Sequence, residues 1–561
     1  MTLRWRKSDI AFGVFVIVAV VALLVGLFLP SHAANRPDQP ILPTPTSTIT
    51  SNAIVRENAL PGTGAWKIPS GSEATIQIQA YASATSASPG QTLIFYVSTQ
   101  LEGTPYSIAV YRLGWYGSLG GRLEAWQANL VGHAQGYWDQ SRHLLVGCHS
   151  CRIDTQTGLV EAKWQPSYKL TVPSDWVSGI YLAKFVDANN FQTYVPFDVR
   201  GSTNADYVVV TSDTTYAAYN NWGGYSLYPF NTASSDAENS GGSLSRASKV
   251  SFDRPYTEGD GSGHVLAFEA DAIHWLEREG YDVSYISSAD LHENPRQLLY
   301  HQAYISLGHD EYWTKEMRDG VEYARDHGVG LAFLGANASY WQMRFEPDSA
   351  GTPDRTIVCY KVETGHNDLA RDRLYGKDNS RVTAQWRDPV LARPENALIG
   401  IMFSDYGNAG HGFPWQVSAQ ATSPLLQGTD LRPGLQYGCG LVGYEWDRVF
   451  ANGATPAGLH VLATSSTVDI SGTPDVSNTT YYIAPSGALV FATGSIYWTY
   501  ALDNYREFVD NPCAAQPPVV PGMQQLMAHV MRELVTNHHS QQLTQTTNGE
   551  VYEPVGWMRE E

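Results

Sequence analysis

The chain has 561 residues, which is too long for a single hydrophobic core, so we expect about two or three domains. An apolar content of 43% is sufficient for sizeable cores. The formal net charge of −19 argues against nucleic acid as a partner, because phosphates are neutralised by clustered Lys and Arg that this chain lacks.

The first 33 residues predict a targeting segment. Arg4, Arg6 and Lys7 precede an unbroken apolar run over residues 10–29. A run of this length is typical of a membrane-spanning signal anchor, whereas the small residues at 31–34 leave a cleaved signal peptide open. Because the basic end stays in the cytoplasm, both interpretations place the protein outside the cytoplasm, either membrane-anchored or secreted.

Residues 34–64 and 65–201 differ in pattern. The first segment is rich in Pro, Thr and Ser, a composition that buries too little apolar surface to fold, so we interpret it as a linker. The second alternates polar and apolar residues, as over 74–80, with turn residues between short strand candidates. This pattern predicts an immunoglobulin-like (Ig-like) β-sandwich domain over 65–201.

The five cysteines define no disulfide framework. Cys148 and Cys151 form a C-x-x-C pair, which has neither the second pair of a zinc site nor the βαβ surroundings of a redox motif. We therefore predict a loop disulfide between them. Cys359, Cys439 and Cys513 stay unassigned.

Beyond residue 201 strands and helices alternate. Apolar strands and amphipathic helices, one of them capped by Thr314, are predicted at 207–210, 266–279, 281–286, 303–307, 329–334, 488–492 and 523–536. Such alternation predicts a mostly parallel α/β sheet covered on both faces. We assign this α/β domain to 202–545, with insertions over 339–480, and a C-terminal tail to 546–561. The predicted fold class is thus multidomain α/β plus β, behind an N-terminal membrane helix.

Ligands of open parallel sheets gather beyond the carboxyl ends of the strands. Polar and aromatic residues with small neighbours follow four of the predicted strands, at 211–225, 308–313, 335–341 and 493–498. The sequence therefore predicts a site at this edge of the sheet.

A covalent nucleophile is not evident at this edge. The small residues over 335–339 resemble a nucleophile turn, but the central residue is Asn337, and no G-x-S-x-G occurs. A metal site fits better, because His309 and Glu311 are two apart and point to the same side of an extended chain. A carboxylate with phenolates suits a hard trivalent metal. The alternative is that these residues are an acidic cluster at a helix N-terminus.

At these residues the chain resembles the large (beta) subunit of the N,N-dimethylformamidase family. The motifs are His309-x-Glu311 followed by Tyr and Trp, then Gly335-x-Asn337, and upstream Tyr216-x-x-Tyr219 followed by Asn. The resemblance covers roughly residues 205–540 and implies a glutamine-amidotransferase-like fold. It also implies one iron (Fe³⁺), held by two tyrosines and a glutamate, and hydrolysis of an amide.

Carried over residue by residue, the resemblance makes Glu311 a metal ligand, His309 an acid/base or orienting group, and Asn337 the amide that polarises the substrate. Tyr219 is the first expected tyrosine ligand. Tyr256 is the second, although the family's tyrosine can correspond to Phe252 instead, in which case a ligand is missing. The remaining candidates for the ligand set are Tyr216, Asp310 and Asp253. Glu445 and Asp447 form an acidic pair with two interpretations, the border of the cleft or a surface loop, of which we favour the surface loop.

The leading hypothesis is an extracytoplasmic, iron-dependent hydrolase of amide or related C–N bonds, acting on a small-molecule amide or an envelope-derived substrate. The family enzyme works in the cytoplasm with a small subunit, whereas this chain has a predicted membrane segment, so its substrate is not transferred. We expect no nucleic acid, contact with the membrane through the N-terminal helix, and a possible homo-oligomer. The rival hypothesis is a metal-free surface protein whose β-sandwich binds saccharide or cell-envelope polymer.

Overall fold

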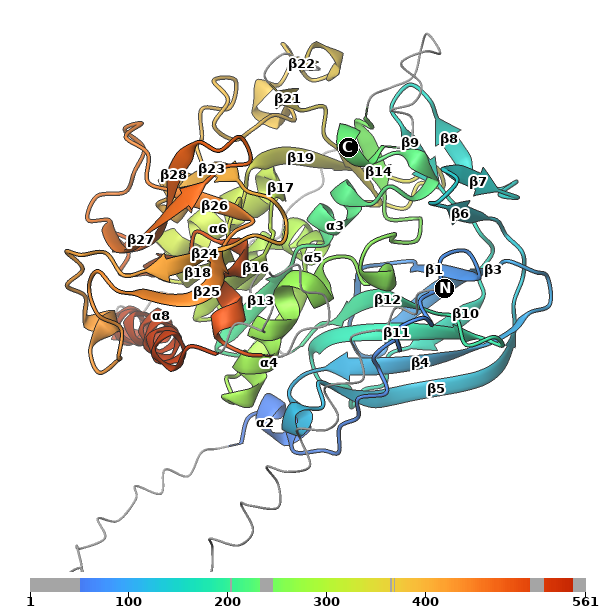
Figure 1. Ribbon diagram of the computed structural model, residues 1–561, viewed down its shortest axis with the longest axis horizontal. Helices are drawn as coiled ribbons and strands as arrows, with labels where there is room; N and C mark the ends of the chain where they lie inside the picture. The colour runs from blue at the N-terminus through green and yellow to red at the C-terminus, as the bar shows by residue number, and fades with distance from the viewer. Residues whose placement is uncertain are drawn as a thin grey trace, which may run out of the picture. The chain divides into compact units, whose positions relative to one another are not determined.

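The computed structural model describes residues 51–201, 204–232, 246–363, 366–367, 369–504 and 519–547 (Figure 1). The predicted membrane helix and most of the predicted linker lie outside these residues. Within them, no helix is both long and apolar enough to cross a membrane.

Two mainly antiparallel sheets form the sandwich, which we define as residues 78–199. The first has three strands, in the order β1 (Ile78–Ala82), β3 (Thr92–Thr99) and β10 (Tyr168–Thr171). The second has five, in the order β2 (Ser86–Ala87), β12 (Gln192–Val199), β11 (Gly179–Asp187), β4 (Pro105–Leu113) and β5 (Gly121–Val131). Side chains of both sheets share one core, in which the ring centroids of Phe95 and Phe185 lie 5.6 Å apart.

A mixed seven-stranded sheet dominates the rest of the chain. Its order is β15 (Val283–Ser287), β13 (Tyr207–Thr211), β16 (Ala303–Gly308), β18 (Gly330–Gly335), β29 (Leu489–Ala492), β28 (Pro474–Ile483) and β27 (His460–Val468). The strands from β15 to β29 pair in parallel, whereas β28 and β27 are antiparallel.

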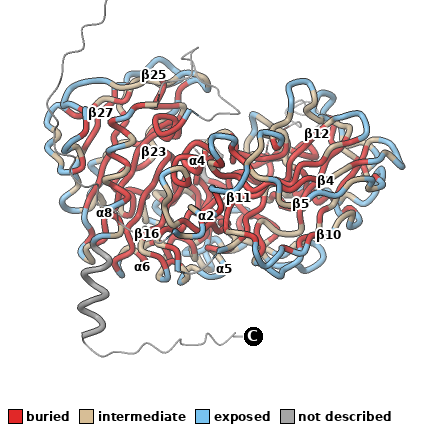
Figure 2. Tube along the Cα trace, turned by 90° about the horizontal axis from the view of Figure 1, so that it is seen from below, coloured by how far each residue is buried: buried red, intermediate tan, exposed pale blue. Residues whose placement is uncertain are grey.

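Side chains of this sheet point alternately into two cores, as the period of a strand requires. Val209 belongs to the first core, which α4 (Ala270–Arg278) and α8 (Pro521–Thr547) cover. Val208 and Val210 belong to the second, which α5 (Ser288–Glu293) and α6 (Lys315–Asp326) cover. Figure 2 shows buried chain running through this interior, with exposed chain on the outer loops. Thr314 caps α6 as predicted, because its side chain accepts from the amide of Met317.

The remaining elements are short. A four-stranded sheet has the order β14 (Lys249–Ser251), β20 (Thr356–Val358), β19 (Trp341–Glu346) and β17 (Tyr312–Thr314). The two-stranded ribbons are β6 (Tyr137–Asp139) with β7 (Leu144–Val146), β8 (Arg152–Asp154) with β9 (Leu159–Glu161), β21 (Val362–Glu363) with β22 (His366–Asn367), β23 (Met402–Tyr406) with β26 (Glu445–Arg448), and β24 (Phe413–Gln416) with β25 (Gln436–Val442). The short helices are α2 (Ala53–Asn58), α3 (Asp213–Tyr219) and α7 (Asn396–Ile399).

The sandwich and the seven-stranded sheet share the first core. Tyr111 and Leu182, on the outer face of the five-stranded sheet, pack in the same cluster as Trp275 of α4. Beside them a buried ion pair joins β4 to α4: Arg112 Nη1 and Nη2 donate to Glu277 Oε2 and Oε1, both at 2.8 Å.

Other polar groups complete this cluster. Glu277 also accepts from Asn58 Nδ2 at 2.7 Å and from the Tyr285 hydroxyl at 3.0 Å. Gly114 is required here, since a Cβ would lie 2.4 Å from Glu277 Oε2. The Tyr116 hydroxyl accepts from Arg112 Nη1 at 3.1 Å. We call Arg112, Glu277, Asn58, Tyr116 and Tyr285 the Arg112 corner.

The predicted fold class is wrong. Instead of an Ig-like sandwich followed by a mostly parallel, helix-covered sheet resembling glutamine-amidotransferase-like folds, the described chain is sheet-rich with mixed sheets and few helices. Residues 339–480, predicted as insertions, supply strand β27 and most of β28. The connection from Ile483 to Leu489 is so short that β28 and β29 can pair only as an antiparallel hairpin. The predicted domain boundaries stay a prediction.

Candidate functional site

Strands β16 and β18 end side by side at Gly308 and Gly335. A Cβ on Gly335 would lie 1.8 Å from the Gly308 carbonyl oxygen, so the close approach requires glycine. The residues that follow β16 and β18, among them His309, Glu311 and Asn337, are thereby placed at one edge of the sheet.

Asn337 is fixed by two carboxylates of β26. Its φ of 57° is left-handed, a conformation that Asn tolerates better than most residues. Its backbone N–H donates to Asp447 Oδ1 at 2.8 Å, and its side-chain Nδ2 donates to Glu445 Oε2 at 2.9 Å. Asn337 Oδ1 is buried and has no hydrogen-bond partner among the described residues. One acceptor of the amide is therefore left for a ligand or water.

His309 lies between two carboxylates. Its Nε2 is 3.1 Å from Glu445 Oε2 and 3.4 Å from Glu311 Oε2, and its side chain is fully buried. Burial lowers the pKa of His309, but the negative charges of Glu445, Glu311 and Asp310 outweigh burial and raise this pKa to about 9. The imidazole of His309 is therefore protonated near neutral pH.

Two tyrosines complete the group. The Tyr228 hydroxyl donates to both carboxylate oxygens of Glu311, at 2.6 and 2.7 Å. The Tyr219 ring centroid lies 4.3 Å from that of Tyr228 and 5.3 Å from that of His309. Burial, and then the charge of Glu311, raise the pKa of both phenols well above the usual range. Only a bound cation would make phenolates favourable here.

We call Tyr219, Tyr228, His309, Glu311, Asn337 and Glu445 the Glu311 site. Other aromatic side chains surround it: the ring of His264 lies 5.4 Å from that of Tyr219, and the half-buried Tyr444 lies 6.4 Å from His309. A cavity of about 630 Å³, lined by Ile54 and Trp176 among others, contains none of the site's residues.

The sequence-predicted residues divide into two groups. His309, Glu311, Asn337 and Tyr219 come together, and the other candidates have different partners. Tyr216 donates to Glu269 Oε1, Asp310 Oδ2 accepts from Ser306 at 2.8 Å, Asp253 pairs with Arg355 at 2.8 Å, and the Tyr256 ring contacts that of Tyr216 at 6.2 Å.

Sequence reasoning missed Tyr228 and misplaced Glu445. Tyr228 lies in a loop between the short helices η2 (Trp222–Gly224) and η3 (Pro229–Asn231), where no periodic pattern marks it. Glu445 is buried and not on a surface loop. Its spacing from Asp447 was a usable signal, since residues two apart on a strand share a face.

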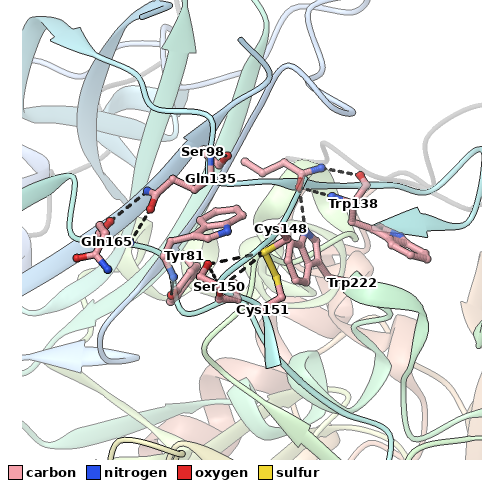
Figure 3. The surroundings of a disulfide bond; sticks show 12 residues. Tyr81, Ser98, Gln135, Trp138, Cys148, Ser150, Cys151, Gln165 and Trp222 are labelled. Carbon is pink, nitrogen blue, oxygen red and sulfur yellow. Dashed lines mark hydrogen bonds between the residues drawn. A yellow bond between two sulfur atoms is a disulfide. The ribbon is translucent and has the colours of Figure 1, made fainter. Parts of the chain in front are cut away.

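A disulfide joins Cys148 and Cys151 beside Trp222 (Figure 3). Both cysteines pack against a cluster that contains Trp222, the first residue of η2. The Trp222 indole N–H donates to Gln79 Oε1 of the sandwich at 2.8 Å. The sandwich thus helps to fix the chain just before Tyr228.

The donor chemistry of the Glu311 site fits a hard metal ion. Among the described residues, no group of three or more His, Cys, Asp and Glu side chains could hold a metal ion. Two phenol rings in contact, with one hydroxyl on both oxygens of a buried carboxylate, offer oxygen donors of the kind that a trivalent ion prefers.

Comparison with known proteins places this chain beside one family. A family model described as "N,N-dimethylformamidase beta subunit-like, C-terminal" matches residues 107–513, starting inside β4. The N,N-dimethylformamidase beta subunit of Alcaligenes sp is 23% identical over 422 residues, covering 63% of this chain and 53% of the relative. That of Paracoccus aminophilus is 23% identical over 418 residues, covering 62% and 53%. The chain spans about half the length of these curated relatives.

Among solved structures, a cycloisomaltooligosaccharide glucanotransferase of Paenibacillus sp. has 9% identity and a TM-score of 0.15, covering 74% of this chain and 68% of that chain. A score this low carries no structural argument.

Proposed function

The chain belongs to the N,N-dimethylformamidase beta subunit-like family, and on this basis we propose that it hydrolyses an amide or a related C–N bond with the help of iron. The observation that carries the proposal is the Tyr228 hydroxyl, which lies within 2.7 Å of both Glu311 carboxylate oxygens while its ring contacts that of Tyr219. Tyr219, Tyr228 and Glu311 would hold the ion. When bound, it would supply Lewis acidity toward a carbonyl oxygen or a water molecule.

The other residues of the Glu311 site have complementary tasks. His309 Nε2 and Glu445 Oε2 are 3.1 Å apart, close enough to pass a proton between them. In hydrolysis, Glu445 would take a proton from the water whose oxygen adds to the carbonyl carbon. Protonated His309 would give one to the departing nitrogen as the C–N bond breaks. One N–H of Asn337 Nδ2 is held by Glu445, and the second would donate to the carbonyl oxygen as negative charge develops on it.

We also propose that the protein works outside the cytoplasm and with another chain. The Cys148–Cys151 disulfide supports an oxidising compartment. The relatives' printed names describe a beta subunit, which supports association with a different subunit or with a second copy. The molar mass of the purified protein from light scattering tests self-association.

Metal analysis with a matched pair of variants tests the proposed function. The purified chain should hold about one iron, show a visible phenolate-to-iron band and hydrolyse a member of a panel of small amides. Tyr228→Phe should lose the band and the activity, because it removes a donor beside Glu311. Tyr256→Phe, which also removes one partly buried phenol, should keep both. Equal effects of the two changes, or a wild type that takes up no iron, would refute the proposal.

A further inference from the structure

Lys361 is a buried cation enclosed by aromatic rings next to the Glu311 site. Its side chain is fully buried, and Nζ lies 3.4 Å from the ring centroid of Tyr228. The rings of Trp341 and Tyr312 lie 4.8 and 5.3 Å from the same nitrogen. An ammonium at these distances is attracted by the negative face of each ring.

The four-stranded sheet builds this enclosure. Tyr312 and Trp341 are paired in register between β17 and β19. Lys361 follows β20 closely, and its backbone N–H donates to the Thr383 carbonyl at 3.2 Å. Its φ of 60° is unusual for a residue with a long side chain. Such a conformation persists only where the surrounding structure fixes it, and it is enriched at functional sites.

The charge of Lys361 acts on both groups that meet at the Tyr228 hydroxyl. The Glu311 carboxylate accepts from the Tyr228 hydroxyl at 2.6 and 2.7 Å, so the Lys361 ammonium lies against the ring that contacts Glu311. Tyr228 has the ammonium against its ring, and its oxygen accepts a hydrogen bond from the Tyr312 hydroxyl at 2.6 Å. Both contacts withdraw electron density from a Tyr228 phenolate.

We propose that Lys361 is a positioning residue that tunes Tyr228 as a metal ligand. This inference rests on the proposed function, since it requires a metal at Tyr228. A cation against the ring makes the phenolate a weaker electron donor, which leaves the bound ion a stronger Lewis acid. The geometry also explains why a lysine is buried here, where desolvation of its charge costs free energy.

The visible spectrum of the iron-loaded full chain tests this role. Lys361→Met shortens the side chain by one atom and removes its charge. The filled phenolate orbitals should then rise in energy, and the charge-transfer band should move to longer wavelength. Turnover should fall about tenfold, in line with a buried cation–π contact. Lys361→Arg keeps a cation on the rings and should restore the band toward that of wild type.

Lys184→Met is the matched control. Lys184 is also buried, with Nζ 5.6 Å from the Tyr111 ring centroid, but it lies on β11 of the sandwich. Its replacement should leave the spectrum unchanged. If Lys361 were only structural, Lys361→Met would lower the Tm of the metal-free protein and leave the band unshifted. That result would overturn the inference about Lys361 but not the proposed function. A wild type without iron would overturn the proposed function first.

Discussion

The Arg112 corner and the Glu311 site are both buried clusters of charge, and they differ in how fully their polar atoms are partnered. In the corner, the guanidinium meets both oxygens of Glu277, and Asn58 and Tyr285 donate to the same carboxylate. In the Glu311 site, His309 Nδ1 and Asn337 Oδ1 have no hydrogen-bond partner among the described residues.

This difference separates a structural network from a binding site. A buried network that serves stability is completed by the protein itself, because every unpartnered polar atom costs free energy. Unpartnered atoms that cluster at the carboxyl ends of parallel strands indicate groups held ready for a ligand. Substitutions in the corner should therefore change stability, and substitutions in the site should change metal content and turnover.

The largest expected effect on function is that of Glu311→Gln. The change removes the negative oxygen donor that Tyr228 contacts, so the protein should lose its iron and its amide hydrolysis together. The metal-free variant should unfold at a lower temperature, because the buried cations His309 and Lys361 lose a negative neighbour. Iron analysis and calorimetry measure the two effects, and a variant that keeps its iron would contradict the assignment of Glu311.

Arg112→Met should have the largest effect on stability. It leaves Glu277 without its cation in the interior, which costs about 3–5 kcal/mol when one partner of a buried pair is removed. Urea denaturation measures the loss. The double change Arg112→Met with Glu277→Leu should recover much of it, because no unpaired charge remains. If Arg112→Met lowered the free energy of unfolding by less than about 1 kcal/mol, the ion pair would contribute no more than an exposed pair does, which would contradict this prediction.

Asn337→Ala should slow turnover and leave the iron in place. Asn337 contacts Glu445 but no proposed ligand, so metal analysis should give the wild-type value. Loss of one donor to a developing oxyanion usually costs about 10²–10³ in kcat. Steady-state kinetics on the best amide of the panel measure this, and iron loss in Asn337→Ala would mean that the two tasks are not separate.

The smallest effect on function is expected for Tyr216→Phe, whose ring lies 5.5 Å from that of His264. Its hydroxyl donates to the buried Glu269, so its removal should lower stability by about 1–3 kcal/mol and leave the iron band unchanged. Absorption spectra and urea denaturation of this variant and of Tyr219→Phe make the comparison direct. If Tyr216→Phe lost the iron band, Tyr216 would have to be assigned as a metal ligand.

Sequence patterns predicted the parts of the site that depend on local geometry. His309 and Asn337 were predicted because each follows an apolar strand, and the ends of parallel strands share an edge. Tyr228 was not, because a loop without periodicity carries it and only the folded chain brings it to Glu311. Glu445 comes more than one hundred residues after Asn337, and its approach depends on a ribbon outside the central sheet.

The fold was limited in the same way. Single strands such as β16 and β18 were visible as apolar runs, since burial on both faces leaves few polar residues. The antiparallel strand β28 was not visible in the sequence. Its residues 478–481, Asn-Thr-Thr-Tyr, resemble those of a surface strand, although most of β28 is buried. Pairing partners are a tertiary property that composition does not encode.

The core shared by the sandwich and the seven-stranded sheet has a consequence for how this chain can evolve. Recombination that exchanged the sandwich for an unrelated one would expose the face of α4 around Trp275. It would also leave Glu277 without Arg112, its partner in the ion pair. The two regions should therefore be inherited together, and the family match, which starts inside β4, fits such joint descent. In engineering terms, chimeras joined near residue 201 should fail to fold, whereas crossovers in peripheral ribbons should be tolerated.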